Sequence, residues 1–245
     1  MYPWLIHHFR VTMFTTQDRP VPGDLVEGLF ESLTSLQPET DEWRGNKAFH
    51  RRSGNSSVQR FELTEQPHRL DFTMVGPSNL ELASFDGTLE AAALSPLSDL
   101  DSFKLIADRI YANSEPPIRC AVAGLLYLPA ISVHESYQHL KQLIPAMDLD
   151  YDHTSDFMLQ INRFAASSVV EGLRLNRLAI FSSLSSGFVV MPQAQGPLAT
   201  GGHWTQLVVD INTSQGNTTS FDKQIFDGLR EEMFDAFRFV SQGVQ

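Results

Sequence analysis

Residues 119–143 read RCAVAGLLYLPAISVHESYQHLKQL and combine a strand signal with a helix signal. The nearly continuous apolar run Arg119–Leu128 predicts a buried strand. Ser132 and Glu135 stand three residues apart just ahead of an apolar stripe, which is the spacing of a helix capping box. This segment therefore predicts a strand that is followed at once by a helix over Ser132–Leu143.

The same order of elements occurs twice along the chain. In the first half, a strand signal at Leu5–Phe14 precedes a helix signal at Asp24–Leu36, and a second helix signal follows at Ser98–Tyr111 after several strands. The second half ends in a helix signal at Phe221–Val240, whose stripe is rich in phenylalanine. Each of these amphipathic helices needs a sheet face on which to bury its apolar stripe.

We therefore predict an α+β protein built from two tandem strand-helix-(four-strand)-helix repeats with antiparallel sheets. The N-terminal repeat covers residues 1–117 and the C-terminal repeat residues 118–245, with the short connector Ala112–Pro117 between them. This order is similar to that of the TATA-box-binding-protein and helix-grip folds, in which an antiparallel sheet curls around a long helix. Such a similarity bears on the fold and transfers no function.

Composition limits the possible partners. The chain has 245 residues, of which 42% are hydrophobic and 19% charged, and its net charge is −11. An acidic chain repels polyanions at long range, so nucleic acid is disfavoured as a partner. His50, Arg51 and Arg52 form the densest basic group, and we expect them in a solvated loop.

Cysteine content and apolar runs bear on the compartment. Cys120 is the single cysteine, so no disulfide forms within the chain, and its apolar setting predicts a buried, unreactive thiol. The N-terminus lacks a basic segment before an apolar run, and the longest apolar stretch, Cys120–Ile131, is too short to span a membrane. We expect a cytoplasmic protein with no membrane partner.

Two Asn-Arg dipeptides stand out as candidate ligand-binding residues. A hairpin that places Asn162 opposite Asn176 would bury an apolar face and carry Arg163 and Arg177 on it. A buried arginine needs either an acidic partner or an anionic ligand. The structural alternative, in which Asp210 or Asp156 pairs with the arginines, is preferred, and anion binding stays open.

Templates for catalysis and metal binding do not fit. His134 and His139 lie five residues apart on a helix, too far around it to share a zinc ion. The acidic turn Asp148–Asp152 lacks the glycine of a calcium loop, and Gly196–Gly202 precedes a strand where a phosphate loop would open a helix. We expect no metal, no cofactor and no catalytic residue, and we place His203 in an exposed loop.

The C-terminal half carries motifs that resemble a known family. The motifs are Gly124–Tyr127, Leu159–Arg163, Leu173–Arg177 and Leu207–Asn212, followed by the long phenylalanine-rich helix. They resemble a sporadically distributed family of uncharacterised bacterial proteins. The resemblance implies a bacterial or phage-related origin and no particular activity.

These observations favour a non-enzymatic protein-interaction or assembly module that binds another protein or self-associates. The alternative is a protein that binds nucleic acid or an anionic ligand on a concave sheet face through Arg163, Arg177, Arg51 and Arg52. A hydrolase with an unrecognised Asp/His site is the third hypothesis. A contiguous positive face would favour the second of these over the first.

Overall fold

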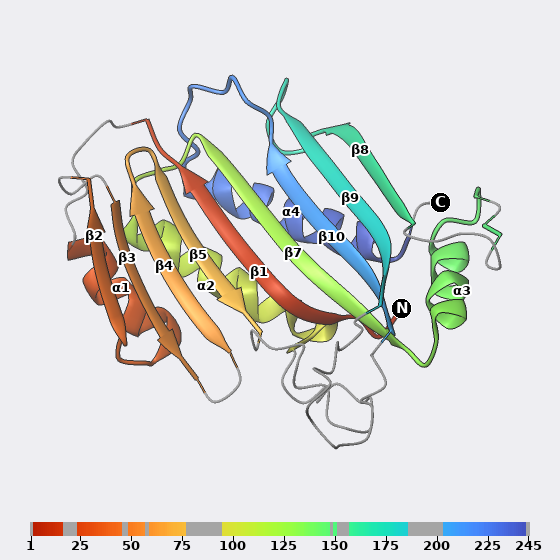
Figure 1. Ribbon diagram of the computed structural model, residues 1–245. Coiled ribbons are helices and arrows are strands. Elements are labelled where there is room, and N and C mark those ends of the chain that lie inside the picture. Colours follow the sequence, from red (N-terminus) through yellow and green to blue (C-terminus); the bar gives the residue numbers. More distant parts are fainter. Residues whose placement is uncertain are drawn as a thin grey trace, which may run out of the picture.

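The chain forms an α+β structure in which helices cover one face of a single antiparallel sheet (Figure 1). The computed structural model describes residues 2–16, 24–45, 49–56, 59–76, 95–147, 149–150, 157–185 and 203–243. Within these ranges the sheet contains ten strands in the order β2-β3-β4-β5-β1-β7-β10-β9-β8, with the short β6 paired to β1. The opposite face carries no helix in the described part of the chain, and we call it the open face.

The first half supplies one side of the sheet. Its elements are β1 (Leu5–Phe14), α1 (Asp24–Thr34), β2 (Thr40–Arg44), β3 (Phe49–Asn55), β4 (Arg60–Gln66), β5 (Arg69–Val75), β6 (Ser95–Pro96), a 3-10 turn at Leu97–Asp99 and α2 (Leu100–Asn113). The expected four strands between two helices are present here as β2 to β5, together with the two-residue β6. The alternation of polar and apolar residues over Arg69–Met74, after Val58–Leu63 and the turn Thr64–His68, predicts a hairpin, and β4 does pair with β5.

The second half supplies the other side. Its elements are β7 (Arg119–Ala130), α3 (Val133–Leu143), β8 (Met158–Ala166), β9 (Arg174–Ser185), β10 (His203–Thr213) and α4 (Lys223–Ser241). Three strands, not the expected four, lie between α3 and α4 in the described ranges. The predicted N-cap is confirmed, because Ser132 Oγ accepts from the N–H of Glu135 at 3.1 Å. The Glu135 carboxylate accepts from Ile131 N–H at 2.6 Å, one residue before the N-cap N–H that a capping box would use.

One sheet and one core span both halves. β1 pairs with β7 along nearly its whole length, so the sheet continues across the predicted boundary at residue 117. Phe9 of β1 packs on Phe103 of α2 at 4.0 Å between ring centroids, and on Phe234 and Phe237 of α4 at 6.1 Å each. The division into two repeats stays a prediction, and the two predicted segments share their hydrophobic core.

Close packing at the centre of the sheet depends on a glycine. Gly124 of β7 lies directly under Phe237, and a Cβ added at Gly124 would stand 2.6 Å from Phe237 Cζ. The ring can therefore reach the β7 backbone only because position 124 has no side chain. Cys120, on the same strand, is buried as expected, and burial raises the pKa of its thiol to about 12.

Candidate functional site

The two edges of the sheet differ in length and in charge. At one edge, β2 has five residues, three of which are charged, namely Asp41, Glu42 and Arg44. At the other edge, β8 has nine residues and only one charge, Arg163. Natural sheets protect their edges with short strands, charges, prolines or bulges, because an open edge can pair with another chain. By these criteria β2 is protected and β8 is not.

The outer side of β8 presents backbone groups in a regular pattern. The N–H of Ser183 donates to the carbonyl of Phe157, and the β8–β9 register runs without a bulge from there to Ala166. Hydrogen-bonded and non-bonded pairs alternate in an antiparallel ladder, so odd-numbered residues of β8 bond to β9. The backbone groups of Gln160, Asn162 and Phe164 therefore point outward, where no described strand pairs with them.

Side chains on this strand are also exposed. Met158 is 70% exposed and Phe164 is 65% exposed, and both project on the open face. An edge strand that carries exposed apolar side chains is a site at which another chain can pair. β8 thus combines unpaired backbone groups with uncovered apolar side chains.

The predicted hairpin register is wrong by two residues. Asn162 lies opposite Leu178 instead of Asn176, and Arg163 lies directly opposite Arg177. A slip of two residues keeps every side chain on its original face, so both arginines still share a face with Leu159 and Phe181 as expected. This face is the one that the helices cover.

Among the described residues, neither arginine has the carboxylate partner that the structural alternative requires. Within the described ranges, Arg163 and Arg177 form no ion pair with a carboxylate, and Arg177 Nε is buried without a hydrogen-bond partner. Asp210 cannot serve either arginine, because it lies on the open face, where its carboxylate is 3.8 Å from Arg10. Asp156, the other suggested partner, lies outside the described residues.

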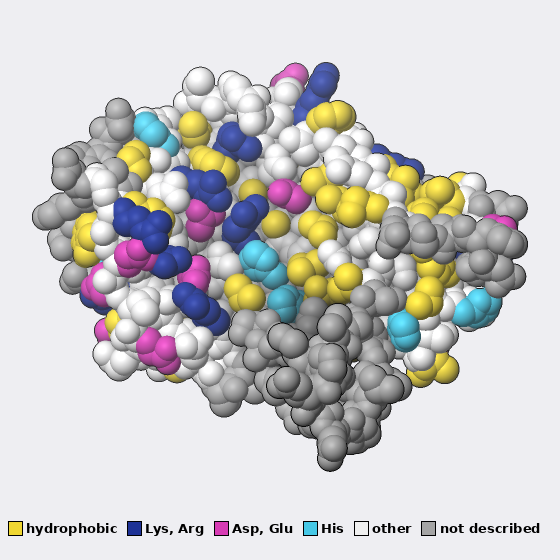
Figure 2. All heavy atoms as spheres, viewed as in Figure 1, with side chains coloured by type: hydrophobic (Ala, Val, Ile, Leu, Met, Phe, Trp, Pro, Cys, Tyr) yellow, Lys and Arg dark blue, Asp and Glu magenta, His cyan; other side chains and the backbone are white. Residues whose placement is uncertain are grey.

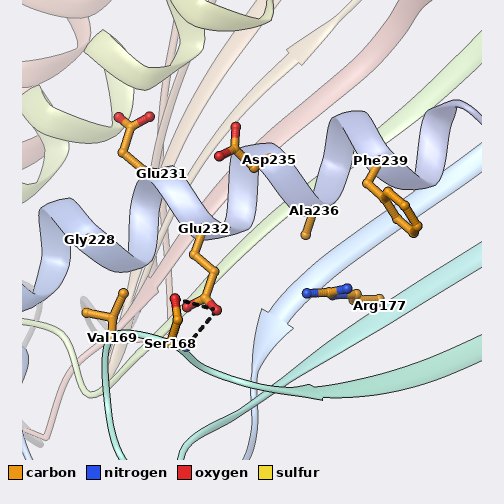
Figure 3. Close-up of a pocket in the computed structure, with 9 residues that line it drawn as sticks. All are labelled: Ser168, Val169, Arg177, Gly228, Glu231, Glu232, Asp235, Ala236 and Phe239. Carbon is orange, nitrogen blue, oxygen red and sulfur yellow. Dashed lines mark hydrogen bonds between the residues drawn. The ribbon is translucent and has the colours of Figure 1, made fainter.

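Arg177 lines a groove between α4 and the β8–β9 hairpin. The groove has a volume of about 540 Å³ and is bordered by the segment after β8, by β9 and by one flank of α4 (Figure 3). Figure 3 shows Arg177 beneath Ala236, with Glu231 and Asp235 projecting from α4 away from it. Phe239, which is 49% exposed, closes the far end.

The carboxylates around this groove are engaged elsewhere. Glu232 accepts from Ser167 Oγ at 2.7 Å and from Ser168 N–H at 2.9 Å. Asp235 pairs with Arg238 at 3.1 Å on its own helix, and Glu231 pairs with Arg230 at 2.9 Å and with Lys104. The hydrogen bond from Lys104 lowers the pKa of Glu231, so this acid stays ionised and paired. None of these carboxylates neutralises Arg177.

The groove has its shape because the segment after β8 docks on α4. Gly228 of α4 faces Val169, and a Cβ at position 228 would meet Val169 Cγ1 at 2.8 Å. Glu232 fixes the same segment through the two serines. Periodicity alone did not reveal these residues, since Glu232 and Phe239 stand off the apolar stripe of α4 and resemble ordinary surface positions.

The remaining asparagines have a structural role. Asn176 Nδ2 donates to Asn212 Oδ1 at 2.8 Å, and Asn212 Nδ2 donates to Asp210 Oδ1 at 2.8 Å. This chain runs across β9 and β10 on the open face and ends at the Arg10 ion pair. Asn176 therefore bonds to Asn212 of β10, whereas the predicted register placed it opposite Asn162.

An arginine-rich area occupies the open face over β1 to β5 and extends to Arg119 of β7 and Asp210 of β10. We call it the arginine face; Figure 2 shows its basic side chains gathered over β1 and β3 to β5, with hydrophobic side chains toward β8 to β10. Six arginines and four carboxylates share it by strand alternation: Arg10, Arg44, Arg51, Arg60, Arg69, Arg119, Glu42, Glu62, Asp71 and Asp210.

Most charges of the arginine face are already paired. Arg60 meets Glu62 at 2.8 Å, and Arg69 meets Asp71 at 2.9 Å. Arg119 donates to the carbonyl of Thr213 at 3.3 Å and lies 4.5 Å over the ring of Phe14, with no ion pair to a described carboxylate. Burial, and next the charge of Arg10, lowers the pKa of His8, so its imidazole adds no charge at neutral pH.

Two predictions about basic residues are corrected. His50, Arg51 and Arg52 lie on β3, not in a loop, because they pair with both β2 and β4. His50 is fully buried and bonds Asp41 at 2.7 Å, Arg52 bonds the same carboxylate at 2.9 Å, and Arg51 pairs with Glu42. His203 is the half-buried first residue of β10, paired with Ala130 and Ser185, instead of an exposed loop residue.

In the described ranges no three His, Cys, Asp or Glu side chains are grouped so as to hold a metal ion, and no helix there is long and apolar enough to cross a membrane. Asp148, Asp152 and the glycine-rich segment 196–202 lie outside the described residues. The chain matches no protein-family model and no curated protein.

Proposed function

We propose that the chain is a non-enzymatic protein-interaction module that binds an extended segment of a partner protein along the outer edge of β8. The observation that carries the proposal is the unprotected edge itself: nine residues without a bulge, with a single charge and with outward backbone groups at Gln160, Asn162 and Phe164. An added strand would satisfy these groups through main-chain hydrogen bonds.

Side chains would add to the backbone pairing. A strand placed beside β8 covers Met158 and Phe164 on the open face, and each large apolar side chain buried contributes roughly 1.5–3 kcal/mol. On the helix-covered face the same strand would lie beside Arg163, whose neighbour across β8–β9 is Arg177. Edge recognition of this kind needs no catalytic group.

Asn162 offers a direct test of strand addition. Its N–H points outward, so Asn162→Pro removes one edge donor without removing a bond to β9, and proline is tolerated on edge strands at such positions. The matched control Asn162→Thr keeps the N–H. Peptides selected from a random twelve-residue display library against the immobilised full chain are then titrated against wild type and both variants by fluorescence anisotropy.

We expect the selected peptides to bind Asn162→Pro at least tenfold more weakly than wild type, and Asn162→Thr within about twofold. Circular dichroism should show the same folded spectrum for all three proteins. Equal affinity of wild type and the proline variant, or a library that yields no binding peptide, would refute strand addition at β8.

A second candidate function is binding of nucleic acid or another polyanion on the arginine face. The arginine face has more arginines than carboxylates although the whole chain has a net charge of −11, and this local excess favours polyanion binding. This candidate predicts that a single-stranded DNA oligonucleotide is shifted in a gel at low salt, that rising salt abolishes the shift, and that Arg119→Gln weakens it. No shift at low salt would exclude it.

The similar succession of strands and helices on the two sides of the β1–β7 pair supports an internal duplication. The family resemblance of the Asn-Arg and Asp-Ile-Asn motifs supports a bacterial or phage-related system. The single buried cysteine is compatible with a cytoplasmic location.

A further inference from the structure

We infer that the segment bound along β8 carries a carboxylate opposite Arg163, and that Arg163 and Arg177 hold this carboxylate together. The inference rests on the proposed strand addition and names the chemistry of the partner: an extended peptide segment with an aspartate or glutamate at one defined position. Two facts carry it: the register of the arginines, and the absence of an ion pair between either arginine and a carboxylate of the described residues.

The register places the two arginines to act on one group. Arg163 and Arg177 are an odd-numbered, hydrogen-bonded pair of the β8–β9 ladder, in which Cα atoms lie about 5.5 Å apart. On the outer side of β8 the alternation is opposite: the even-numbered residues offer the hydrogen bonds, and the odd-numbered residues such as Arg163 do not. The residue of an added antiparallel strand that faces Arg163 would sit in a non-hydrogen-bonded pair, where Cα atoms lie about 4.5 Å apart and side chains are closest.

The charges of Arg163 and Arg177 favour an anion between them. Two guanidinium groups on directly opposed residues repel each other, and a carboxylate near both removes the repulsion while accepting charge-assisted hydrogen bonds. The nearest carboxylates of α4 do not do so, because Glu232 is bound to Ser167 and Ser168, and Asp235 to Arg238. Arg177 lines the groove between β9 and α4, and its buried Nε has no hydrogen-bond partner among the described residues.

A second copy of the chain fits this position poorly. β8 contains no aspartate or glutamate, so pairing of two β8 strands would gather two copies each of Arg163 and Arg177 on one face. Like charges on neighbouring strands destabilise a sheet. Charge complementarity therefore selects a partner segment of different sequence, with an acid where β8 has none.

The test compares peptide selections on four full-length proteins. They are wild type, Arg163→Gln/Arg177→Gln, the charge reversal Arg163→Glu/Arg177→Glu, and Arg174→Gln. Arg174→Gln is the matched control, because this substitution removes an arginine from the same hairpin. Arg174 lies opposite Ala166 and projects on the open face. All four are screened with the same twelve-residue library. Each enriched peptide is then made in two versions, with Glu or with Gln at the acidic position, and the affinity of both versions is measured by titration.

We expect wild type and Arg174→Gln to enrich peptides with Asp or Glu at one position of an alternating apolar pattern. The double Gln variant should bind the Glu peptide at least tenfold more weakly and lose the preference over the Gln peptide, and the charge reversal should enrich Lys or Arg instead.

The two proposals fail differently. Peptides that Asn162→Pro rejects, but that show no acidic preference or bind the double Gln variant equally well, would leave strand addition standing and overturn the inference about the carboxylate. Selection of peptides copying β8 itself would also overturn it, in favour of self-association. A library that yields no binder overturns both.

Discussion

Single residues set how closely the helix layer approaches the sheet. Gly124 is the clearest case, since a methyl group there would stand 2.6 Å from Phe237 Cζ, closer than any unstrained contact. We expect Gly124→Ala to lower the free energy of unfolding by about 1–3 kcal/mol, because Phe237 must leave its rotamer or α4 must shift. Urea denaturation followed by circular dichroism measures this.

Gly28 of α1 is the matched control. A Cβ there meets nothing within 4 Å, and alanine is preferred to glycine inside a helix, so Gly28→Ala should raise stability by about 0.5–1 kcal/mol. The opposite signs separate overpacking from a general effect of replacing glycine. A Gly124→Ala protein as stable as wild type would show that the contact with Phe237 relaxes without cost.

At the scale of elements, local sequence signals predict the positions of helices correctly, but they do not predict the register in which strands pair. Predicted Ser132–Leu143 became α3 at Val133–Leu143, because a capping box and an apolar stripe are properties of neighbouring residues. The β8–β9 hairpin was predicted with the right faces and the wrong register. Period-two alternation tells faces apart but cannot distinguish registers that differ by two, so Arg163 meets Arg177 instead of an apolar residue.

Contacts with neighbouring strands likewise determine whether the charges near each sheet edge are paired and whether that edge is covered. His50, Arg51 and Arg52 resembled a solvated basic group, yet β2 supplies Asp41 and Glu42 to them across the ladder. Nothing on β8 itself indicates that its outer side stays open. That became visible only when the strand order showed β8 last in the sheet.

On the scale of the whole molecule, the shared core predicts cooperative unfolding. Phe9 joins β1 to α2 and α4, and β1 pairs with β7, so neither predicted segment can unfold without exposing apolar surface of the other. We expect one urea transition, with coincident midpoints by far-ultraviolet circular dichroism and by fluorescence of Trp4 and Trp204, which are both buried. Phe9→Ala should lower the free energy of unfolding by about 3–5 kcal/mol and move this single transition to a lower urea concentration.

Separate probes make the outcome decisive. Trp4 lies in the first half and Trp204 in the second, so variants that keep one or the other report on each half. Two transitions with different midpoints, or a Phe9→Ala effect confined to one tryptophan, would show that residues 1–117 and 118–245 unfold as independent domains.

Local periodicity, caps and turn residues were enough to predict the α+β class, the positions of the helices, the β4–β5 hairpin and the common face of Arg163 and Arg177, because each depends on residues close together in the chain. Tertiary structure alone decided that β1 pairs with β7, that Asp210 lies beside Arg10 and not beside Arg177, and that β8 is the last strand of the described sheet. These outcomes depend on contacts between segments far apart in sequence, where competing pairings have similar local propensities and only the packing of the complete core selects among them.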